Sequence, residues 1–333
     1  MINMAIQLQL GTRGIAQMYT TLAVCLVGLS MLTGAAPGIN AQMLTKDDLH
    51  HEIARYEAAV SNAQSSTGSP VELGRLRVYL ATLYEDAGLY DQSEKMFDGA
   101  IRSFKRSPMS SLDLAAAIDG LGTVYLDTGR LPDAERAELN ALAIRESAGQ
   151  KPELARSWLH LSTLYLRQRS AAKAKQYGVL AANEILSESN AFPEDKISAL
   201  FALSLALGLS HEYTAAIDYS QNALDLLRQN FRPDDFPVGF GTFLLGYAQW
   251  KAGNLAAAGE LMRQGSFVMG RQLGWWSPGY RSVMAQYARF LRQTKEIQSA
   301  KSIERELQRA VTASKEAGNS RRARDTIDIA AFF

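Results

Sequence analysis

The 333-residue sequence has the composition of a folded protein, with 47% hydrophobic and 21% charged residues, which excludes wholesale disorder. It carries 35 Lys and Arg against 34 Asp and Glu, so it lacks the surplus of cations with which a general nucleic-acid binder displaces counterions from phosphates. The only cysteine, Cys25, lies near the N-terminus, and the rest of the chain therefore offers neither disulfides nor thiolate metal ligands.

The N-terminal segment predicts an export signal. Residues 20–36 form an apolar run without charges, after Arg13 and overlapping the small-residue-rich stretch 34–41. We expect residues 1–41 to be a signal peptide, which makes the mature protein periplasmic or secreted. Because this segment exceeds the usual length of about 15 to 30 residues, two alternatives stay open: translation starts at Met18, or the run is retained as a membrane anchor.

Residues 42–73 predict an N-terminal capping helix and a loop. Residues 45–48 (Thr-Lys-Asp-Asp) are an N-capping sequence, and apolar residues follow at helical spacing up to about Ala63. Residues 64–70 are rich in Ser, Gly and Pro and are expected to form the loop. Such a helix would cover the first unit of the repeat array that follows.

A small residue recurs every 40 to 42 residues along the rest of the chain: Ser93, Ala134, Ala174, Ala216, Ala258 and Ala300. A turn position precedes each one by five residues: Gly88, Gly129, Arg169, His211, Gly253 and Lys295. This pattern predicts a helix, a tight turn, and a second helix that crosses the first so closely that only a small side chain fits.

Proline placement supports the same division, since an interior proline would break a helix. Beyond the signal region, every proline except Pro132 falls between successive units, and Pro132 falls at a turn within one. The expected fold is an all-α superhelical solenoid of about six antiparallel helix pairs. Its units are 74–110, 111–151, 152–192, 193–234, 235–277 and 278–316.

The repeat resembles the tetratricopeptide repeat, whose leading helix carries Trp, Leu-Gly and Tyr at fixed spacing. The third unit has Trp158, Leu161 and Tyr165 at these positions, and the second has Leu121, Gly122 and Tyr125. The fourth to sixth units are weaker, with Leu207, Gln249 and Leu291 in place of the Tyr. The long period of about 42 residues resembles that of kinesin light chains.

The resemblance implies a concave groove lined by leading helices that binds a peptide or a protein. In the fifth unit an aromatic stripe recurs at helical spacing, and the fourth unit adds two apolar residues beside it. The candidate groove residues are Phe201, Leu205, Phe240, Phe243, Tyr247 and Trp250. The alternative is that the stripe is core, because most faces of an interior helix in a stacked array are buried.

In the first three units the corresponding inward positions are Thr82, Thr123 and Thr163, with Arg75 and Arg156 nearby. The Asn that clamps a C-terminal carboxylate in some tetratricopeptide repeats is absent from them. The sequence therefore does not support a carboxylate clamp.

No motif predicts catalysis. His50 and His51 are adjacent and splay about 100° apart on a helix, while His160 and His211 stand apart from other ligands in the sequence and are expected to be structural. We therefore expect no enzyme activity, no cofactor and no metal.

The C-terminal tail, residues 317–333, follows the helix stop Gly318-Asn319. It is either frayed, or Ile327, Ile329 and Phe332 cover the last repeat as a cap.

The sequence thus favours an exported, non-catalytic adaptor that binds a protein or peptide in its groove and does not bind nucleic acid. It would contact a membrane only if the N-terminal segment is retained as an anchor. The alternative is a structural scaffold of a cell-envelope assembly that uses its ends or convex face. The oligomeric state stays open.

Overall fold

The computed structural model describes residues 46–65, 68–107, 111–149, 151–273, 275 and 278–316. These residues form thirteen α-helices and, within these ranges, no strand. Helix α2 (Lys46–Ser65) precedes six helix pairs. The pairs are α3 (Pro70–Asp86) with α4 (Tyr90–Phe104), α5 (Ser111–Asp127) with α6 (Leu131–Ala148), α7 (Lys151–Arg167) with α8 (Ala171–Ser187), α9 (Pro193–Leu209) with α10 (Tyr213–Asn230), α11 (Phe236–Lys251) with α12 (Leu255–Leu273), and α13 (Pro278–Gln293) with α14 (Ile297–Glu316).

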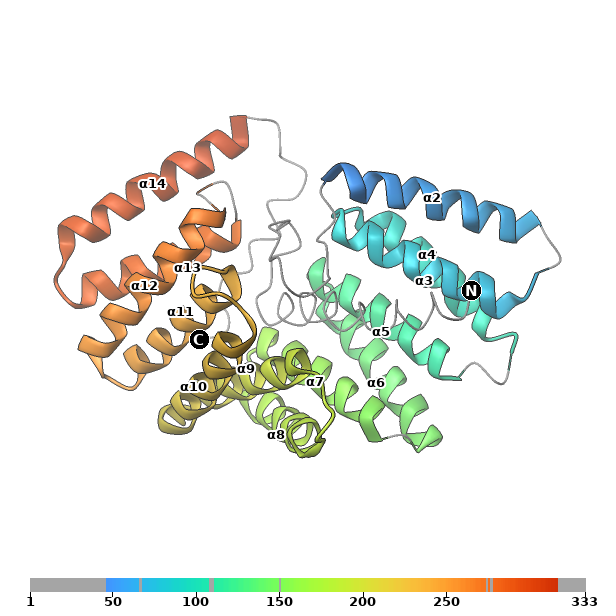
Figure 1. Cartoon of the computed structure of the whole chain (residues 1–333), viewed down its shortest axis with the longest axis horizontal. Helices are drawn as coiled ribbons and strands as arrows, with labels where there is room; N and C mark the ends of the chain where they lie inside the picture. Colours follow the sequence, from blue (N-terminus) through green and yellow to red (C-terminus); the bar gives the residue numbers. More distant parts are fainter. Residues whose placement is uncertain are drawn as a thin grey trace.

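The pairs stack along an arc with α2 at one end and α14 at the other, and α6, α8 and α10 follow its outer edge (Figure 1). Each leading helix packs against the second helix of its own pair, and each second helix packs against the leading helix of the next pair. The expected all-α solenoid is confirmed.

The turn within each pair has one recurring geometry. All six predicted turn residues have positive φ: Gly88 (69°), Gly129 (74°), Arg169 (56°), His211 (64°), Gly253 (89°) and Lys295 (67°). The residue after each donates its backbone N–H to the carbonyl five positions earlier, as Leu89 does to Tyr84 at 2.7 Å. This left-handed residue with its backward hydrogen bond is the Schellman ending of a helix.

The six small residues lie where the two helices of a pair cross, and each is at most 1% exposed. In the first pair the Ser93 hydroxyl also donates a hydrogen bond to the carbonyl of Ala81 at 2.8 Å. In the fifth pair Gly246 of α11 lies against α12, and a Cβ at this position would lie 2.8 Å from the backbone nitrogen of Met262. Close approach of the backbones therefore explains the recurring small side chains.

The hydrophobic core is unevenly divided along the arc. One contiguous cluster runs from Leu126, at the end of α5, to Ala300 in α14. Four smaller clusters hold the region from α2 to α6. The first two units therefore have a more fragmented core than the last four.

Two predictions fall outside the described residues: the signal peptide at residues 1–41 and the tail at residues 317–333. Among the helices of the described residues, none combines the length and the apolar character needed to cross a bilayer.

Candidate functional site

The structure buries the six side chains predicted to line the groove. Their exposed fractions run from 0% to 9%, and all six belong to the large core cluster: Phe201, Leu205, Phe240, Phe243, Tyr247 and Trp250. Helix α11 is buried on nearly all sides, with only Gln249 and Lys251 half-buried. This burial fits the core alternative and not an open, partner-facing stripe.

Contacts within the described residues account for part of this burial. Gly265 of α12 approaches Phe243 so closely that a Cβ on the glycine would lie 2.6 Å from the Phe243 backbone nitrogen. Trp250 packs edge-on against Phe290 of α13, and its indole N–H donates a hydrogen bond to Gln293 Oε1 at 2.8 Å. The Trp250 side chain thus joins α11 to α13, and the backbone at Phe243 lies against α12.

The predicted Thr positions behave differently along the array. Thr82 and Thr123 are half-buried and Thr163 is buried, and each hydroxyl donates to a carbonyl one turn earlier in its own helix. On α5, Ala116 is exposed and lies two turns from Thr123 on the same side of the helix. The leading helix of the second unit therefore keeps a partly open side.

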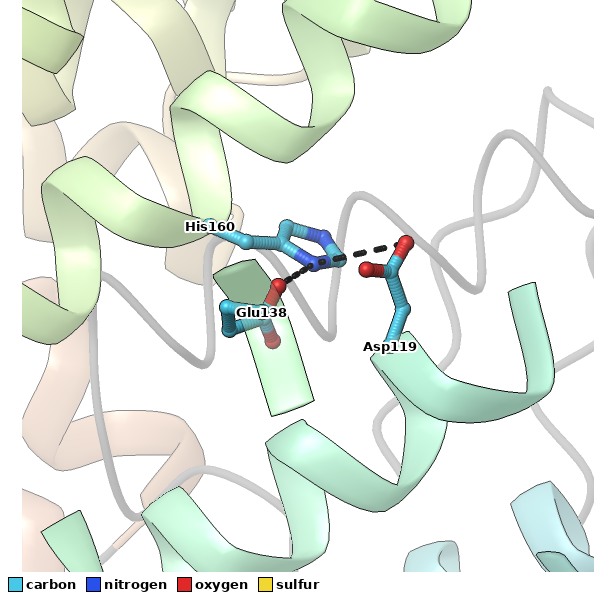
Figure 2. A group of neighbouring side chains, drawn as sticks. All are labelled: Asp119, Glu138 and His160. Atoms are coloured by element: carbon cyan, nitrogen blue, oxygen red, sulfur yellow. Dashed lines mark ion pairs between the residues drawn. The ribbon is translucent and has the colours of Figure 1, made fainter. Parts of the chain in front are cut away.

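A cluster of charged side chains lies at the junction of the second and third units. Asp119 comes from α5, Glu138 and Arg145 from α6, and His160 from α7. Figure 2 shows the His160 ring between the two carboxylates, with ion-pair lines from the ring to both. Three helices of two units thus contribute to one buried group of charged side chains.

The distances define a compact group. His160 Nδ1 lies 3.4 Å from Glu138 Oε2 and 4.0 Å from Asp119 Oδ2. The side chains of Asp119, Glu138 and His160 are 6%, 5% and 13% exposed. Arg145, whose side chain is 1% exposed, forms an ion pair with Asp119 and donates a hydrogen bond to Ser157 Oγ at 2.5 Å.

The local environment shifts the pKa values of the group. Burial raises the pKa of the Glu138 carboxyl to about 7, with His160 opposing and Asp119 reinforcing this shift. Burial, the largest single influence, lowers the pKa of the His160 imidazole, but the Glu138 and Asp119 carboxylates together raise it, and the net shift is upward. The Glu138 carboxyl and the His160 imidazole therefore both hold a proton more strongly than the same groups do in water.

Sequence reasoning treated His160 as structural and missed this group, because its members lie about 20 residues apart on three helices. The sequence did contain one indication of this group, in the repeat position of Glu138. Glu138 follows the small residue Ala134 by four positions, as Phe97 follows Ser93 in the first unit, where Phe97 is 2% exposed. A glutamate at a core position of the repeat is the irregularity that points to the cluster.

Comparisons with known proteins agree with the repeat assignment. Residues 72–147 match the tetratricopeptide repeat family. No curated protein sequence matches the chain at a significant level.

Solved structures extend the likeness to most of the array. The chain is similar to the apo form of RapI, with 14% identity, 80% of this chain and 93% of that chain covered, and a TM-score of 0.65. It is also similar to the kinesin light chain repeats of Podospora anserina, with 15% identity, coverage of 62% and 98%, and a TM-score of 0.52. A Rap protein complexed with competence and sporulation factor gives 12% identity, coverage of 82% and 88%, and a TM-score of 0.53. The resemblance to tetratricopeptide repeats of the kinesin light chain type is therefore confirmed, and these distant structures bear on the fold alone.

Proposed function

We propose that the protein is a non-catalytic, exported adaptor that holds a peptide or protein on the inner side of its arc, in the first two units. This placement rests on the exposed side chains of the leading helices α3 and α5 in the first two units. Ala116 on α5 is exposed, and Arg75 on α3 has 64% of its side chain exposed. Helices α9 and α11, by contrast, present almost no exposed side chain.

The fold supports the proposal by analogy. A superhelical array of helix pairs offers an extended curved surface, and one similar structure is a Rap protein in complex with competence and sporulation factor. The Arg75 guanidinium pairs with Asp113 of the next unit at 2.8 Å, which offsets its charge and leaves the side chain 64% exposed. A partner with a hydrogen-bond-accepting group would suit the exposed side of this guanidinium.

Site-specific photo-crosslinking tests the placement. A photoreactive phenylalanine analogue is introduced at Ala116 on the leading helix α5, or at the control positions Leu139 and Phe267 on the second helices α6 and α12. All three side chains are exposed, and those of the two control positions are 40% and 65% exposed. Crosslinks to one partner from Ala116 and not from the control positions would support the adaptor.

Crosslinks from the control positions Leu139 and Phe267 alone would support the scaffold alternative and contradict the inner-side placement. Export is tested separately by the mass of the chain recovered from fractionated cells. A mature chain that starts at residue 42 would support a cleaved signal, and a full-length chain in the membrane fraction would support the anchor.

A further inference from the structure

We propose that Asp119, Glu138 and His160 form a binding site for a divalent transition-metal ion, with Zn²⁺ as the ion that fits them best. The ion would join α5 and α6 of the second unit to α7 of the third. None of the three ligands is one of the residues on which the proposed partner-binding side rests.

The donor set suits such an ion. The three residues offer one imidazole nitrogen and two carboxylate groups, and all three ligand atoms lie within 4.8 Å of one another. Zn²⁺ accepts nitrogen and carboxylate ligands together, and three protein ligands with a water is a common arrangement. Mg²⁺ prefers oxygen ligands and keeps several waters, so this buried mixed site disfavours it.

The geometry is close to that of a bound state. Ligands at about 2.0 to 2.1 Å from a tetrahedral ion lie about 3.3 Å from each other. His160 Nδ1 and Glu138 Oε2 are already 3.4 Å apart, and His160 Nδ1 and Asp119 Oδ2 are 4.0 Å apart. A bound ion would draw the Asp119 carboxylate closer to the other two ligands, and Arg145 is the present partner of this carboxylate.

The ligand atoms form no regular hydrogen bond, and only Asp119 has an ion pair with a residue outside the set. Glu138 Oε2, His160 Nδ1 and both carboxylate oxygens of Asp119 are buried and accept or donate no hydrogen bond of normal geometry. The ion pair with Arg145 accounts for part of the Asp119 charge. A buried polar atom without a partner is costly, and a metal ion would satisfy all three side chains at once.

The charges around the site also favour a cation. The ligand carboxylates of Asp119 and Glu138 face one buried guanidinium, that of Arg145, which pairs with Asp119. Arg145 also lies 3.8 Å from Glu153, whose nearer partner is Arg156 at 3.3 Å. Two ligand carboxylates against one guanidinium leave one negative charge, which a cation between the ligands would offset.

Metal titration of the purified full-length protein tests the site. The protein is stripped with a chelator, incubated with Zn²⁺ or Mg²⁺, passed through a desalting column, and analysed for bound metal. We expect one retained Zn²⁺ per chain and no Mg²⁺. His160→Ala and the near-isosteric Glu138→Gln should weaken Zn²⁺ binding more than 100-fold, because changes in residues that only support a ligand already cost about 10- to 100-fold.

A His50→Ala/His51→Ala double variant is the matched control, since both residues are exposed and adjacent on α2. Retention of Zn²⁺ in this variant supports the site, and loss of Zn²⁺ in this variant alone would show an adventitious surface ion. X-ray absorption of the wild-type protein should show one imidazole among oxygen ligands, a result that needs no variant. Failure of the folded wild-type protein to retain Zn²⁺ overturns the proposal.

Discussion

Gly122 and Glu138 are in direct contact across the α5–α6 crossing: a Cβ at position 122 would lie 2.6 Å from Glu138 Oε1. The carboxylate thus occupies the space that the glycine leaves. Gly122→Ala should destabilise the protein by about 1 to 3 kcal/mol through overpacking. Urea unfolding measures this change.

The same measurement in a Glu138→Ala background provides the control. Removing the carboxylate opens the space, so the cost of Gly122→Ala should fall by more than half. An equal cost in both backgrounds would show that the clash lies elsewhere.

Arg145 is the counter-ion of a buried carboxylate. Arg145→Ala should cost about 3 to 5 kcal/mol in the free energy of unfolding, because it leaves the Asp119 charge uncompensated in the interior. Arg75→Ala, which removes an exposed ion pair with Asp113, should cost at most about 1 kcal/mol. Similar losses for both variants, measured by denaturant titration, would argue against a special role for the buried pair.

The buried Glu85 carboxyl should make the stability of the protein depend on pH, separately from the charged cluster around His160. Its pKa is raised well above the ordinary 4.5, chiefly by burial and then by the charges of Asp127 and Asp86. Above pH 4.5 the unfolded chain loses this proton first, while the folded chain keeps it until the higher pKa is reached. The contribution to stability is therefore largest at low pH and falls as pH rises from 4.5 through the folded pKa.

Glu85→Gln should remove this contribution and reduce the decline in melting temperature between pH 5 and pH 8, measured with chelator present. Glu72→Gln, at an exposed position of the same helix, should leave the wild-type curve unchanged. If Glu85→Gln also leaves the curve unchanged, the carboxyl is already ionised in the folded protein.

The aromatic stripe is expected to act through packing. Phe243 is fully buried, and Phe243→Ala should cost about 3 to 5 kcal/mol in the free energy of unfolding. Phe267→Ala, at a position 65% exposed on the next helix, should change stability by less than about 0.5 kcal/mol. A stability loss for Phe243→Ala below about 1 kcal/mol would show that the stripe is not packed as core and would favour its assignment to the groove.

The fold could be predicted from the sequence because each repeated feature is local. All six predicted turn positions hold a residue with a left-handed backbone conformation, and three of these residues are not glycine: Arg169, His211 and Lys295. The spacing to the following small residue identified these turns where the residue type alone would not. The weaker fourth to sixth units carry the same turn as the stronger ones.

The site could not be predicted in the same way. Helix α11 is hydrophobic on nearly every side, and a pattern without a polar face does not show which side is open. The charged cluster depends on contacts between three helices, which the spacing of single residues does not reveal. Only comparison of Glu138 with Phe97 in the repeat register would have indicated a polar residue in the core.

The fragmented core of the first two units has a further consequence. In a linear array each unit is supported only by its neighbours, so the strength of each junction decides how far unfolding spreads. The large core cluster begins at the end of α5, and the charged group of Asp119, Glu138 and His160 lies at that boundary. The solenoid thus has one large core that spans its last four units and a divided core in its first two, and a ligand at the boundary would set how closely the two parts unfold together.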